Sequence, residues 1–578
     1  MKHIHYIVAA GLLGSTSIYA VPFADTGSIY KQVKQNQIKK AQETAHPKYK
    51  TTEEHRALVH DVNTVLVNGF KVLGNEDLSK EELETVMKSF VNRELSMKEI
   101  HEAANTLSEY YHTKGFYAAE VTLRPHSIKD GIITLQVAEG YLEKGGISVT
   151  NKGERIKSEK VLALWNNTLN LGALKQDEYE RALLLTNDFP GISAKIDMYL
   201  GEQAGTDDLV VSITDDEVFN GNIDIDNFGS YYTGRTQVGT TLYWNSPTKN
   251  GEEIVARFIT TGKYSNYGYL DVAVPVFDNG MRLGASIDYM KYELDTSKSD
   301  EAGDGTVWDA KVYLKYPIIR TTDLNVESEL SYTHTALKDN DATSEIDNST
   351  IDKGILKISG NRSDDYLLNG ITYFSATVTA GNLSLDNKEQ RENDALTSKT
   401  AGNFTKVNVE LSRLQNLVGD LSTKISVEGQ WASKNLDSSE KYFLGGPYSV
   451  SGYPVGQVAG DNAAVFYADL RYDLYKMPWG GDLQLKGFYS YGWTEIFKDP
   501  SAWQALYPNG EQYAKDNEVT LQTVGLGLSQ TWSDTAVIRI TVGKQVGDNV
   551  LRKYFVDGKD FDKSDDDYRA WIEAIYYF

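Results

Sequence analysis

Apolar and polar residues alternate along the last two-thirds of the chain. The alternation begins at about Glu217 and is clearest at residues 282–289, 324–332 and 536–542. A period of two places apolar side chains on one face of a β-strand and polar side chains on the other. Residues 217–578 are therefore predicted to form a β-sheet with one apolar face.

The connections between these predicted strands differ in length. Asp278-Asn279-Gly280 is a short turn, whereas Asp295–Gly305 and Lys338–Asp352 are predicted to be long, acidic loops rich in Ser and Thr. Short turns on one side and long loops on the other are typical of an outer-membrane β-barrel, whose apolar face points outward to lipid. Sixteen strands would have about 23 residues each with a connection, which accommodates the ~9–11 residues of a membrane strand. Counting alone also allows fourteen or eighteen strands.

The end of the chain fits the same architecture. From Ile572 to Phe578, apolar residues occupy alternate positions and the last residue is aromatic. Tyr576 and Phe578 resemble the C-terminal assembly signal of bacterial outer-membrane proteins. The 37 Tyr and 9 Trp of the chain also suit the aromatic girdles at the two membrane interfaces.

Residues 61–216 mix helices and strands and repeat one order twice. Ser79 with Glu82, and Ser96 with Glu99, have the spacing of a capping box, which marks the start of a helix. The order β-α-α-β-β is predicted over 61–142 and again over 143–216. The strands of the first unit are predicted at 64–73, 118–124 and 131–137. The second unit is predicted to have strands at 146–151, 192–200 and 209–214 and helices near 157–169 and 176–186.

Such a unit has an exposed sheet edge, which can bind an extended chain by strand addition. Ala119, Val121 and Leu123 are the residues predicted to form a client-binding edge in the first unit. The alternative is that both units serve only as spacers.

The first twenty residues are predicted to be a secretory signal. Lys2 supplies the positive start, Ile4–Leu13 is mostly apolar, and Ala20 is a small residue at the expected cleavage site. The alternative is a buried N-terminal strand or helix. No later window holds the ~20 apolar residues of a membrane helix.

Composition narrows the possible functions. The net charge of −23 disfavours nucleic-acid binding, which requires a basic surface. The charge fits either general solubility or acidic outer loops. With no Cys, the chain has no disulfide framework and no thiol nucleophile.

Motifs for chemistry are missing as well. There is no phosphate-binding Walker loop and no Gly-x-Ser-x-Gly elbow. The pairs His55/His60 and His101/His112 lack the spacing of a zinc protease, and the acid-rich run Asp557–Asp567 lacks the residue order of a calcium-binding EF-hand. We therefore predict no catalytic residue, no cofactor and no metal.

Four motifs occur in an order that resembles one family. They are Gly115-Phe116 with Val121, Pro125, Gly131, Leu135, Val137 and Glu139-Gly140; Leu183 to Gly191 (LLLTNDFPG); Asp226 to Ser230 (DNFGS) with Thr233-Gly234-Arg235; and Leu444-Gly445-Gly446 with Val450-Ser451-Gly452-Tyr453. With these motifs the whole mature chain resembles the two-partner-secretion transporters (TpsB), the family of haemolysin and filamentous-haemagglutinin exporters. Within that family it resembles exporters of contact-dependent inhibition toxins.

The resemblance implies a mostly β fold with a defined order of parts. A plug helix would occupy 21–44 and a linker 45–60. Two POTRA domains, the periplasmic units of this family, would occupy 61–142 and 143–216. A 16-stranded barrel would follow over 217–578, with a loop inserted into its lumen at about 442–462.

Two residues depart from the family pattern. The family's inserted loop carries Val-Arg-Gly-Phe/Tyr, and its Arg faces an Asp in a Phe-x-Asp-x-Gly strand motif. Here the Arg position is Ser451, and the strand motif Phe488, Ser490 and Gly492 has Ser at the Asp position. Losing both charges avoids an unpaired buried charge. We expect the two serines to occupy the old contact, where they can bond directly or through water, and the loop to be held less tightly or by other residues.

The predicted plug helix carries Lys31, Lys34, Lys39 and Lys40 and few apolar residues. Inside a wet lumen a helix needs no apolar stripe, and its positive charge would suit an acidic wall. The alternative interpretation is that this segment is a free linker.

The function implied by the resemblance is export of a large exoprotein partner (TpsA-type) across the outer membrane of a Gram-negative bacterium. The POTRA domains would bind the partner in the periplasm, and the barrel would conduct it. Other expected partners are outer-membrane lipid and lipopolysaccharide, the barrel-assembly machinery and periplasmic chaperones. We expect a monomer that binds no nucleic acid. The main alternative is an outer-membrane assembly factor (insertase) of the same superfamily; a passive porin and an outer-membrane enzyme fit less well.

Overall fold

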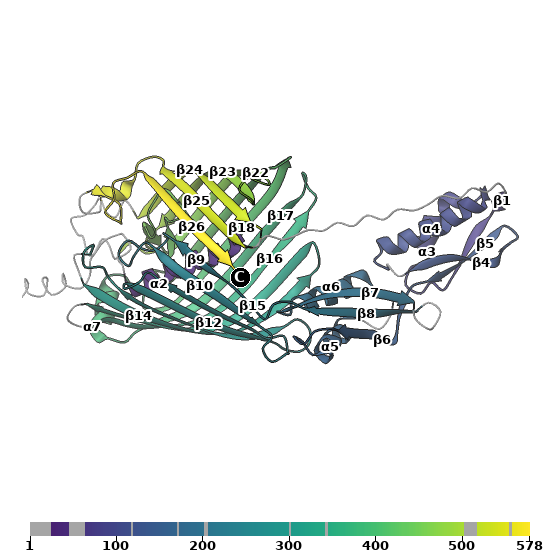
Figure 1. Ribbon diagram of the computed structural model, residues 1–578, viewed down its shortest axis with the longest axis horizontal. Coiled ribbons are helices and arrows are strands. Elements are labelled where there is room, and N and C mark those ends of the chain that lie inside the picture. Colours follow the sequence, from purple (N-terminus) through teal and green to yellow (C-terminus); the bar gives the residue numbers. More distant parts are fainter. Residues whose placement is uncertain are drawn as a thin grey trace, which may run out of the picture.

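The computed structural model describes residues 25–44, 64–116, 119–169, 173–200, 206–299, 302–341, 345–501, 517–533, 535–553 and 558–578. The predicted signal (1–20) and linker (45–60) lie outside these residues. Figure 1 shows a barrel with two smaller α/β units extending from one end of it. Among the described helices, none is long and apolar enough to cross a membrane.

The barrel contains sixteen antiparallel strands in one closed sheet, which confirms the predicted strand number. Each strand pairs with the next along the chain, apart from the β19–β22 pair, which spans an inserted loop. The strands are β9 (Phe219–Asp226), β10 (Gln237–Asn245), β11 (Glu253–Thr260), β12 (Ser265–Pro275), β13 (Arg282–Glu293), β14 (Gly303–Arg320), β15 (Leu324–Asp341), β16 (Glu345–Asp364), β17 (Gly370–Leu385), β18 (Gly402–Val418), β19 (Leu421–Ala432), β22 (Asn462–Leu474), β23 (Asp482–Glu495), β24 (Glu518–Trp532), β25 (Ala536–Gln545) and β26 (Tyr568–Tyr577).

The last strand closes the barrel against the first. β26 pairs with β9 from Glu573 opposite Asp226 to Tyr577 opposite Asn222. Beyond the strand, the backbone N–H and C=O of Phe578 both bond to Gly221, at 3.1 and 2.9 Å. Tyr576 and Phe578, the predicted assembly signal, are both about half exposed on the outer side. The C-terminal residue therefore takes part in closing the sheet.

The period-two pattern separates the two faces of the wall. On β13, Leu283 and Ile287 are exposed to the outside, while Ser286 and Asp288 are buried toward the lumen. In a soluble sandwich the apolar positions would be the buried ones. The inverted arrangement suits a wall with lipid outside and a polar interior.

One predicted loop is instead β-structure. β15 runs to Asp341 and β16 begins at Glu345, and their ladder pairs Lys338 with Asn348. The prediction of a long loop at 338–352 was therefore wrong. A run of polar residues does not mark the end of a barrel strand, because the backbone hydrogen bonds of the sheet can continue beyond the membrane, where the side chains face water. The short turn at Asp278-Asn279-Gly280, between β12 and β13, was predicted correctly.

The first α/β unit has a three-stranded sheet, β2-β5-β4, and a separate pair, β1-β3. The predicted single strand at 64–73 is thus two strands in different sheets. Both predicted capping boxes form, at Ser79 and at Ser96. Hydrogen bonds from Lys114 and Ser79 lower the pKa of Glu82 to about 2. The elements are β1 (Thr64–Val67), β2 (Gly69–Leu73), α3 (Lys80–Met87), the 3₁₀ turn η1 (Lys88–Phe90), β3 (Arg93–Ser96), α4 (Met97–Thr113), β4 (Glu120–Lys129) and β5 (Ile132–Ala138).

The second unit has the predicted β-α-α-β-β order. Its sheet order is β6-β8-β7, and both helices cover one face of that sheet. Trp165 lies fully buried in its core and donates a 2.9 Å hydrogen bond to Thr186. The elements are β6 (Tyr141–Asn151), α5 (Ser158–Thr168), α6 (Gln176–Asn187), β7 (Ile192–Leu200) and β8 (Thr206–Asp215).

This second unit docks on the short turns at one end of the barrel (Figure 1). The Arg320 guanidinium makes two hydrogen bonds, at 2.7 and 2.9 Å, to the Asp188 carboxylate. Arg181 bonds to the carbonyl oxygen of Pro317 at 2.7 Å. Further bonds join Asn167 to Asp278 and Lys157 to Lys249. The contacts reach three successive turns, which follow β10, β12 and β14.

Candidate functional site in the barrel lumen

A helix, α2 (Thr26–Thr44), lies inside the barrel (Figure 1). Asp25 caps it by accepting a 2.6 Å hydrogen bond from the backbone N–H of Ser28. The hydroxyl of Thr26 donates to Asp339 on β15, and so does its backbone N–H, at 3.0 Å. The start of the helix is therefore attached to the barrel wall near the ends of the strands farthest from the α/β units.

The helix has a short apolar face, although its sequence predicted a polar helix. Ile29, Tyr30 and Val33 are buried against apolar side chains of the wall, including Met290 and Val307. Burying these side chains contributes on the order of 1–3 kcal/mol each. The helix is thus held by packing as well as by charge.

The lysines of α2 bind acidic residues of the wall. Lys34 pairs with Asp288 at 2.9 Å and with Asp309 at 3.5 Å. Lys39 pairs with Glu428 at 2.7 Å.

Lys40 lies among three carboxylates, at 2.8 Å from Asp224, 3.1 Å from Asp226 and 2.8 Å from Glu573. Lys31 is partly buried near Glu440 of the inserted loop and also near Lys406 and Lys353 of the wall. Lys34, Lys39 and Lys40 therefore pair with acidic groups of the wall, and those groups come from strands far apart in the chain.

The inserted loop between Ala432 and Asn462 fills the lumen beside α2. It contains the 3₁₀ turn η2 (Ser438–Glu440) and a hairpin of β20 (Tyr442–Leu444) and β21 (Val458–Gly460). α2 contacts this loop along much of its length: Ser438 Oγ bonds to Asp25 at 2.8 Å, Gln35 to the carbonyl of Phe443 at 3.1 Å, and Lys39 to the carbonyl of Tyr448 at 3.1 Å.

The loop motif Val450-Ser451-Gly452-Tyr453 packs on β23, β24, β25 and β26. Its backbone makes the polar contacts: the Gly452 N–H donates to Thr523 at 2.9 Å, and Trp571 donates to the Ser451 carbonyl at 2.7 Å. Gly492, in the facing strand motif, allows a close approach, since a Cβ there would lie 2.7 Å from Val450. The motif is therefore seated by small residues and neutral hydrogen bonds.

The two serines do not bond to each other. Both Ser451 and Ser490 are buried, but the Ser490 hydroxyl has no hydrogen-bond partner among the described residues. The loop motif is instead held by other residues, through its backbone. Phe488, the first residue of the strand motif, stacks on Tyr467 with ring centroids 5.8 Å apart.

The helix, the loop and the wall leave a cavity of about 80 Å³ between them. Its lining includes Lys39, Glu428, Ser451, Arg539 and Glu573. That volume holds a handful of water molecules but no segment of polypeptide. In this conformation the cavity offers no passage for a protein chain.

The predicted client-binding edge in the first α/β unit is partly covered. β4 is an edge strand of its sheet, but the side chains of Ala119 and Val121 are buried in the core. Ser108 on α4 accepts a 3.0 Å hydrogen bond from the Val121 N–H, and His112 lies 3.1 Å from the Ala119 carbonyl oxygen. Of the three predicted residues, only Leu123 lies beyond these α4 contacts.

The second unit has a comparable edge on β7. Asn187 bonds to both the N–H and the carbonyl of Ala194 on the outer side of this strand. Farther along, Met198 and Tyr199 are exposed. The outer edge of β7 past Asn187 is therefore a second candidate for strand addition.

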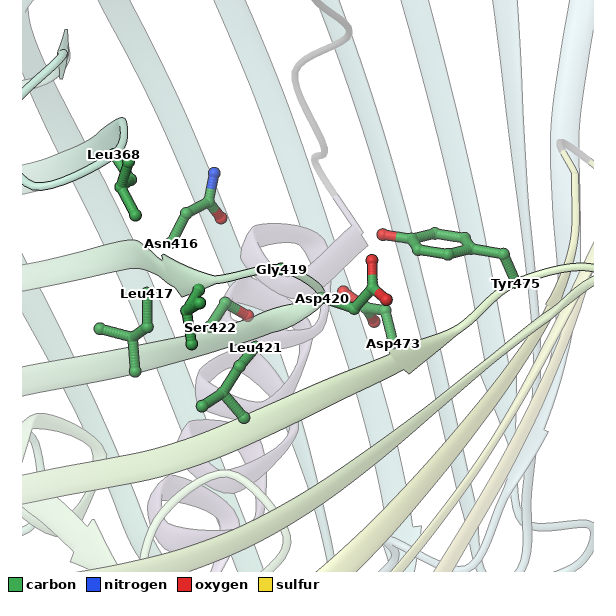
Figure 2. A pocket seen from close by; sticks show the side chains of 10 residues that line it. Leu368, Asn416, Leu417, Gly419, Asp420, Leu421, Ser422, Asp473 and Tyr475 are labelled. Atoms are coloured by element: carbon green, nitrogen blue, oxygen red, sulfur yellow. The ribbon is translucent and has the colours of Figure 1, made fainter.

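A shallow groove of about 320 Å³ lies at the end of the barrel that carries the α/β units. It is formed by the turns that follow β16, β18 and β22, which are not the turns that bind the second unit. Figure 2 shows Tyr475 pointing toward Asp420 and Asp473 across this groove, with Leu368 on the neighbouring turn. The groove lies on a part of the rim that the second unit leaves uncovered.

The acid-rich run near the C-terminus is neutralised by arginines. Asp560 accepts hydrogen bonds from Arg552 and Arg569, and Asp562 pairs with Arg235 and Arg569. Within the described ranges, no group of three or more His, Asp or Glu residues is placed to hold a metal ion. The run therefore acts as an anchor for the loop between β25 and β26, which also contains the 3₁₀ turn η4 (Val550–Lys553).

Comparison with known proteins identifies related sequences and folds. The family model described as haemolysin secretion/activation protein ShlB/FhaC/HecB matches residues 205–508, and the ShlB-type POTRA domain model matches residues 65–140. The heme/hemopexin transporter protein HuxB of Haemophilus influenzae is 26% identical over 557 residues, covering 94% of this chain and 95% of HuxB.

Two solved structures share the fold. CdiB from Escherichia coli has a TM-score of 0.71 at 16% identity, covering 96% of this chain and 99% of CdiB. BamA from Haemophilus ducreyi lacking POTRA domains 1–3 has a TM-score of 0.51 at 13% identity, covering 89% of this chain and 100% of that structure.

Arginine at position 451 tests whether Ser451 and Ser490 are neighbours in function. Ser451→Arg alone is expected to reduce barrel assembly or secretion more than the pair Ser451→Arg/Ser490→Asp, because a single buried charge without a partner is strongly destabilising, by about 3–5 kcal/mol. Assembly is measured by heat-modifiable mobility on gels. A pair no better than the single variant would show that the two positions are not in contact.

Proposed function

This chain belongs to the haemolysin secretion/activation family ShlB/FhaC/HecB, a family of outer-membrane transporters, and we propose that it exports one large exoprotein through a pore that α2 closes at rest. The chain is an outer-membrane β-barrel with POTRA domains in the periplasm, and it secretes its partner through the barrel. The insertase alternative has less support, since the fold matches BamA less well than CdiB.

One observation carries the proposed gating. The lumen is occupied by α2 and by the inserted loop, and the contacts that hold them are hydrogen bonds, ion pairs and apolar packing. Such contacts can be exchanged for others without breaking the barrel wall. A client chain that offers competing contacts could therefore displace α2 while the sixteen strands stay closed.

The relatives suggest a class of client. HuxB is named a heme/hemopexin transporter, and its likeness extends over nearly the whole chain. The sequence likeness to CdiB is lower and shorter: CdiB of Dickeya dadantii is 22% identical over 415 residues, covering 67% of this chain. We therefore favour an exoprotein related to heme acquisition over a contact-dependent inhibition toxin.

The periplasm contains no nucleotide whose hydrolysis could drive export across the outer membrane. Folding of the client outside the cell would make movement one-way, since a folded domain cannot return through the pore. We propose further that the protein performs no catalysis and acts as a monomer. It would contact lipopolysaccharide in the membrane, and the barrel-assembly machinery and periplasmic chaperones during its own biogenesis.

Co-expression with the neighbouring exoprotein gene tests the function directly. The exoprotein is expected at the cell surface with the full chain and absent from it when residues 61–216 are deleted, because the client then has no periplasmic binding site. Surface appearance is scored by antibody labelling of intact cells. Secretion that continues after the deletion, from a barrel shown by heat-modifiable mobility to be folded, would contradict client binding by the POTRA domains.

Removal of α2 tests the closed pore. Deleting residues 25–44 is expected to raise channel conductance in planar bilayers, and Lys40→Glu should do the same, since it adds a fourth carboxylate beside Asp224, Asp226 and Glu573. Lys80→Glu is the control, because the Lys80 side chain is 84% exposed on a POTRA helix. Unchanged conductance in both the deletion and Lys40→Glu would rule out a plug.

A proline on the edge of β7 tests strand addition. The Ala194 N–H points away from β8, so the Met198 N–H, four residues on, points the same way. Met198→Pro should therefore reduce secretion while keeping the β7–β8 pairing, whereas Met198→Ala keeps the backbone donor and should secrete normally. Equal secretion by both variants would exclude this part of β7 as a binding edge.

A further inference from the structure

The inserted loop needs an anchor that replaces the Arg–Asp pair its family motif would supply. The tip of the loop, at Ser451 and Gly452, is held by neutral hydrogen bonds to Thr523, Gln545 and Trp571. Charged contacts are found instead at the base of the loop, at the 3₁₀ turn η2. This turn is therefore where the loop is fixed electrostatically.

Glu440 in η2 is bound by two lysines from different strands. Lys353 on β16 lies 2.7 Å from one carboxylate oxygen, and Lys406 on β18 lies 2.6 Å from the other. All three side chains are at most 11% exposed. Lys406 and Gln430 also bond to the Glu440 backbone carbonyl, at 2.8 and 3.2 Å. A buried ion pair with this many bonds is costly to break from one side.

The residue that follows is anchored as well. Lys441 pairs with Asp461, at the far end of the loop, at 2.6 Å, and donates to the carbonyl of Ile496 at the same distance. The Asp461 carboxylate also accepts the backbone N–H of Leu436 and of Lys498. The two limbs of the loop are thereby joined to each other and to the connection after β23.

The same turn forms the seat of α2. Ser438 donates a 2.8 Å hydrogen bond to Asp25, the residue that caps the helix. Gly27 permits the contact, because a Cβ there would collide with the Ser438 hydroxyl and lie 2.8 Å from the backbone nitrogen of Ser439. Lys31, one turn farther along the helix, is partly buried near Glu440 and near the two lysines that bind it. The start of α2 thus rests on a turn whose position depends on Glu440.

We propose that Glu440 is a positioning residue for the closed pore: clamped by Lys353 and Lys406, it holds η2 where α2 can dock, so that loop and helix are released together. The inference rests on the proposed role of α2 in closing the pore. It assigns the anchoring role of the missing Arg–Asp pair to a different part of the same loop. It also makes the wall strands β16 and β18 part of the gate, because they supply the two lysines that hold Glu440.

The test is single-channel conductance of the full chain with Glu440→Gln, which keeps the shape of the side chain and removes its charge. A rise of about tenfold or more in the open fraction is expected, because the buried lysines lose their partner and η2 loses its fixed position. Glu329→Gln is the matched control, since Glu329 pairs with Lys311 at 2.5 Å on the same wall without contacting the loop.

A second variant keeps the test valid if Glu440→Gln fails to assemble. Gly27→Ala leaves every charge in place and removes the close approach between α2 and η2, so it should open the pore as well. Combining Glu440→Gln with deletion of residues 25–44 should give the conductance of the deletion alone. Assembly of each variant is checked by heat-modifiable mobility.

The outcomes separate the two proposals. If deletion of 25–44 leaves conductance unchanged, the closed-pore role of α2 fails. If the deletion opens the pore but neither Glu440→Gln nor Gly27→Ala does, the role of Glu440 is overturned. If Glu440→Gln raises conductance further in the absence of α2, Glu440 restrains the loop independently, and release of loop and helix as one unit is overturned.

Discussion

Closure of the sheet is the constraint on which the rest of this structure depends. In a bilayer, every backbone N–H and C=O must find its partner within the protein, so a β-sheet can cross only if its first and last strands pair. Here β26 meets β9, and the hydrogen bonds between Phe578 and Gly221 extend that seam to the last residue. Because the outer face of the barrel contacts lipid, the polar side chains of the strands face the lumen. A wide polar lumen can hold a helix and a loop.

The charges of the lumen follow from that closure. Acidic side chains on the inner wall, such as Asp288 and Glu573, are too crowded to remain without cations. The lysines of α2 supply part of the counter-charge, and Lys353 and Lys406 of the wall pair with Glu440 of the loop. A lumen packed in this way is stable as a whole but is built from contacts that can be exchanged. That property is what a protein-conducting pore needs at rest.

The sequence predicted the features that arise from local patterns. The period of two led to the barrel, and Ser79 and Ser96 with their glutamates marked two helix starts. The sequence did not predict features that depend on contacts between segments far apart in the chain. The break between β1 and β2 depends on pairing with β3 and β5, and the covering of β4 at Val121 depends on Ser108 of a preceding helix. The contact of Glu440 with Lys353 and Lys406 joins residues from a loop and two strands, and no local sequence motif predicts it. Likewise, the apolar face of α2 consists of only three residues, too few to stand out from a polar helix.

The docking of the second POTRA domain gives the mouth of the barrel two unlike sides. The domain stands under the turns after β10, β12 and β14, whereas the turns after β16, β18 and β22 form the open groove seen in Figure 2. The second domain therefore covers one side of the barrel mouth and leaves the groove on another side uncovered. The second POTRA domain would direct the chain to the uncovered side of the barrel mouth. The side of entry would then be set by how this domain docks, before α2 is displaced.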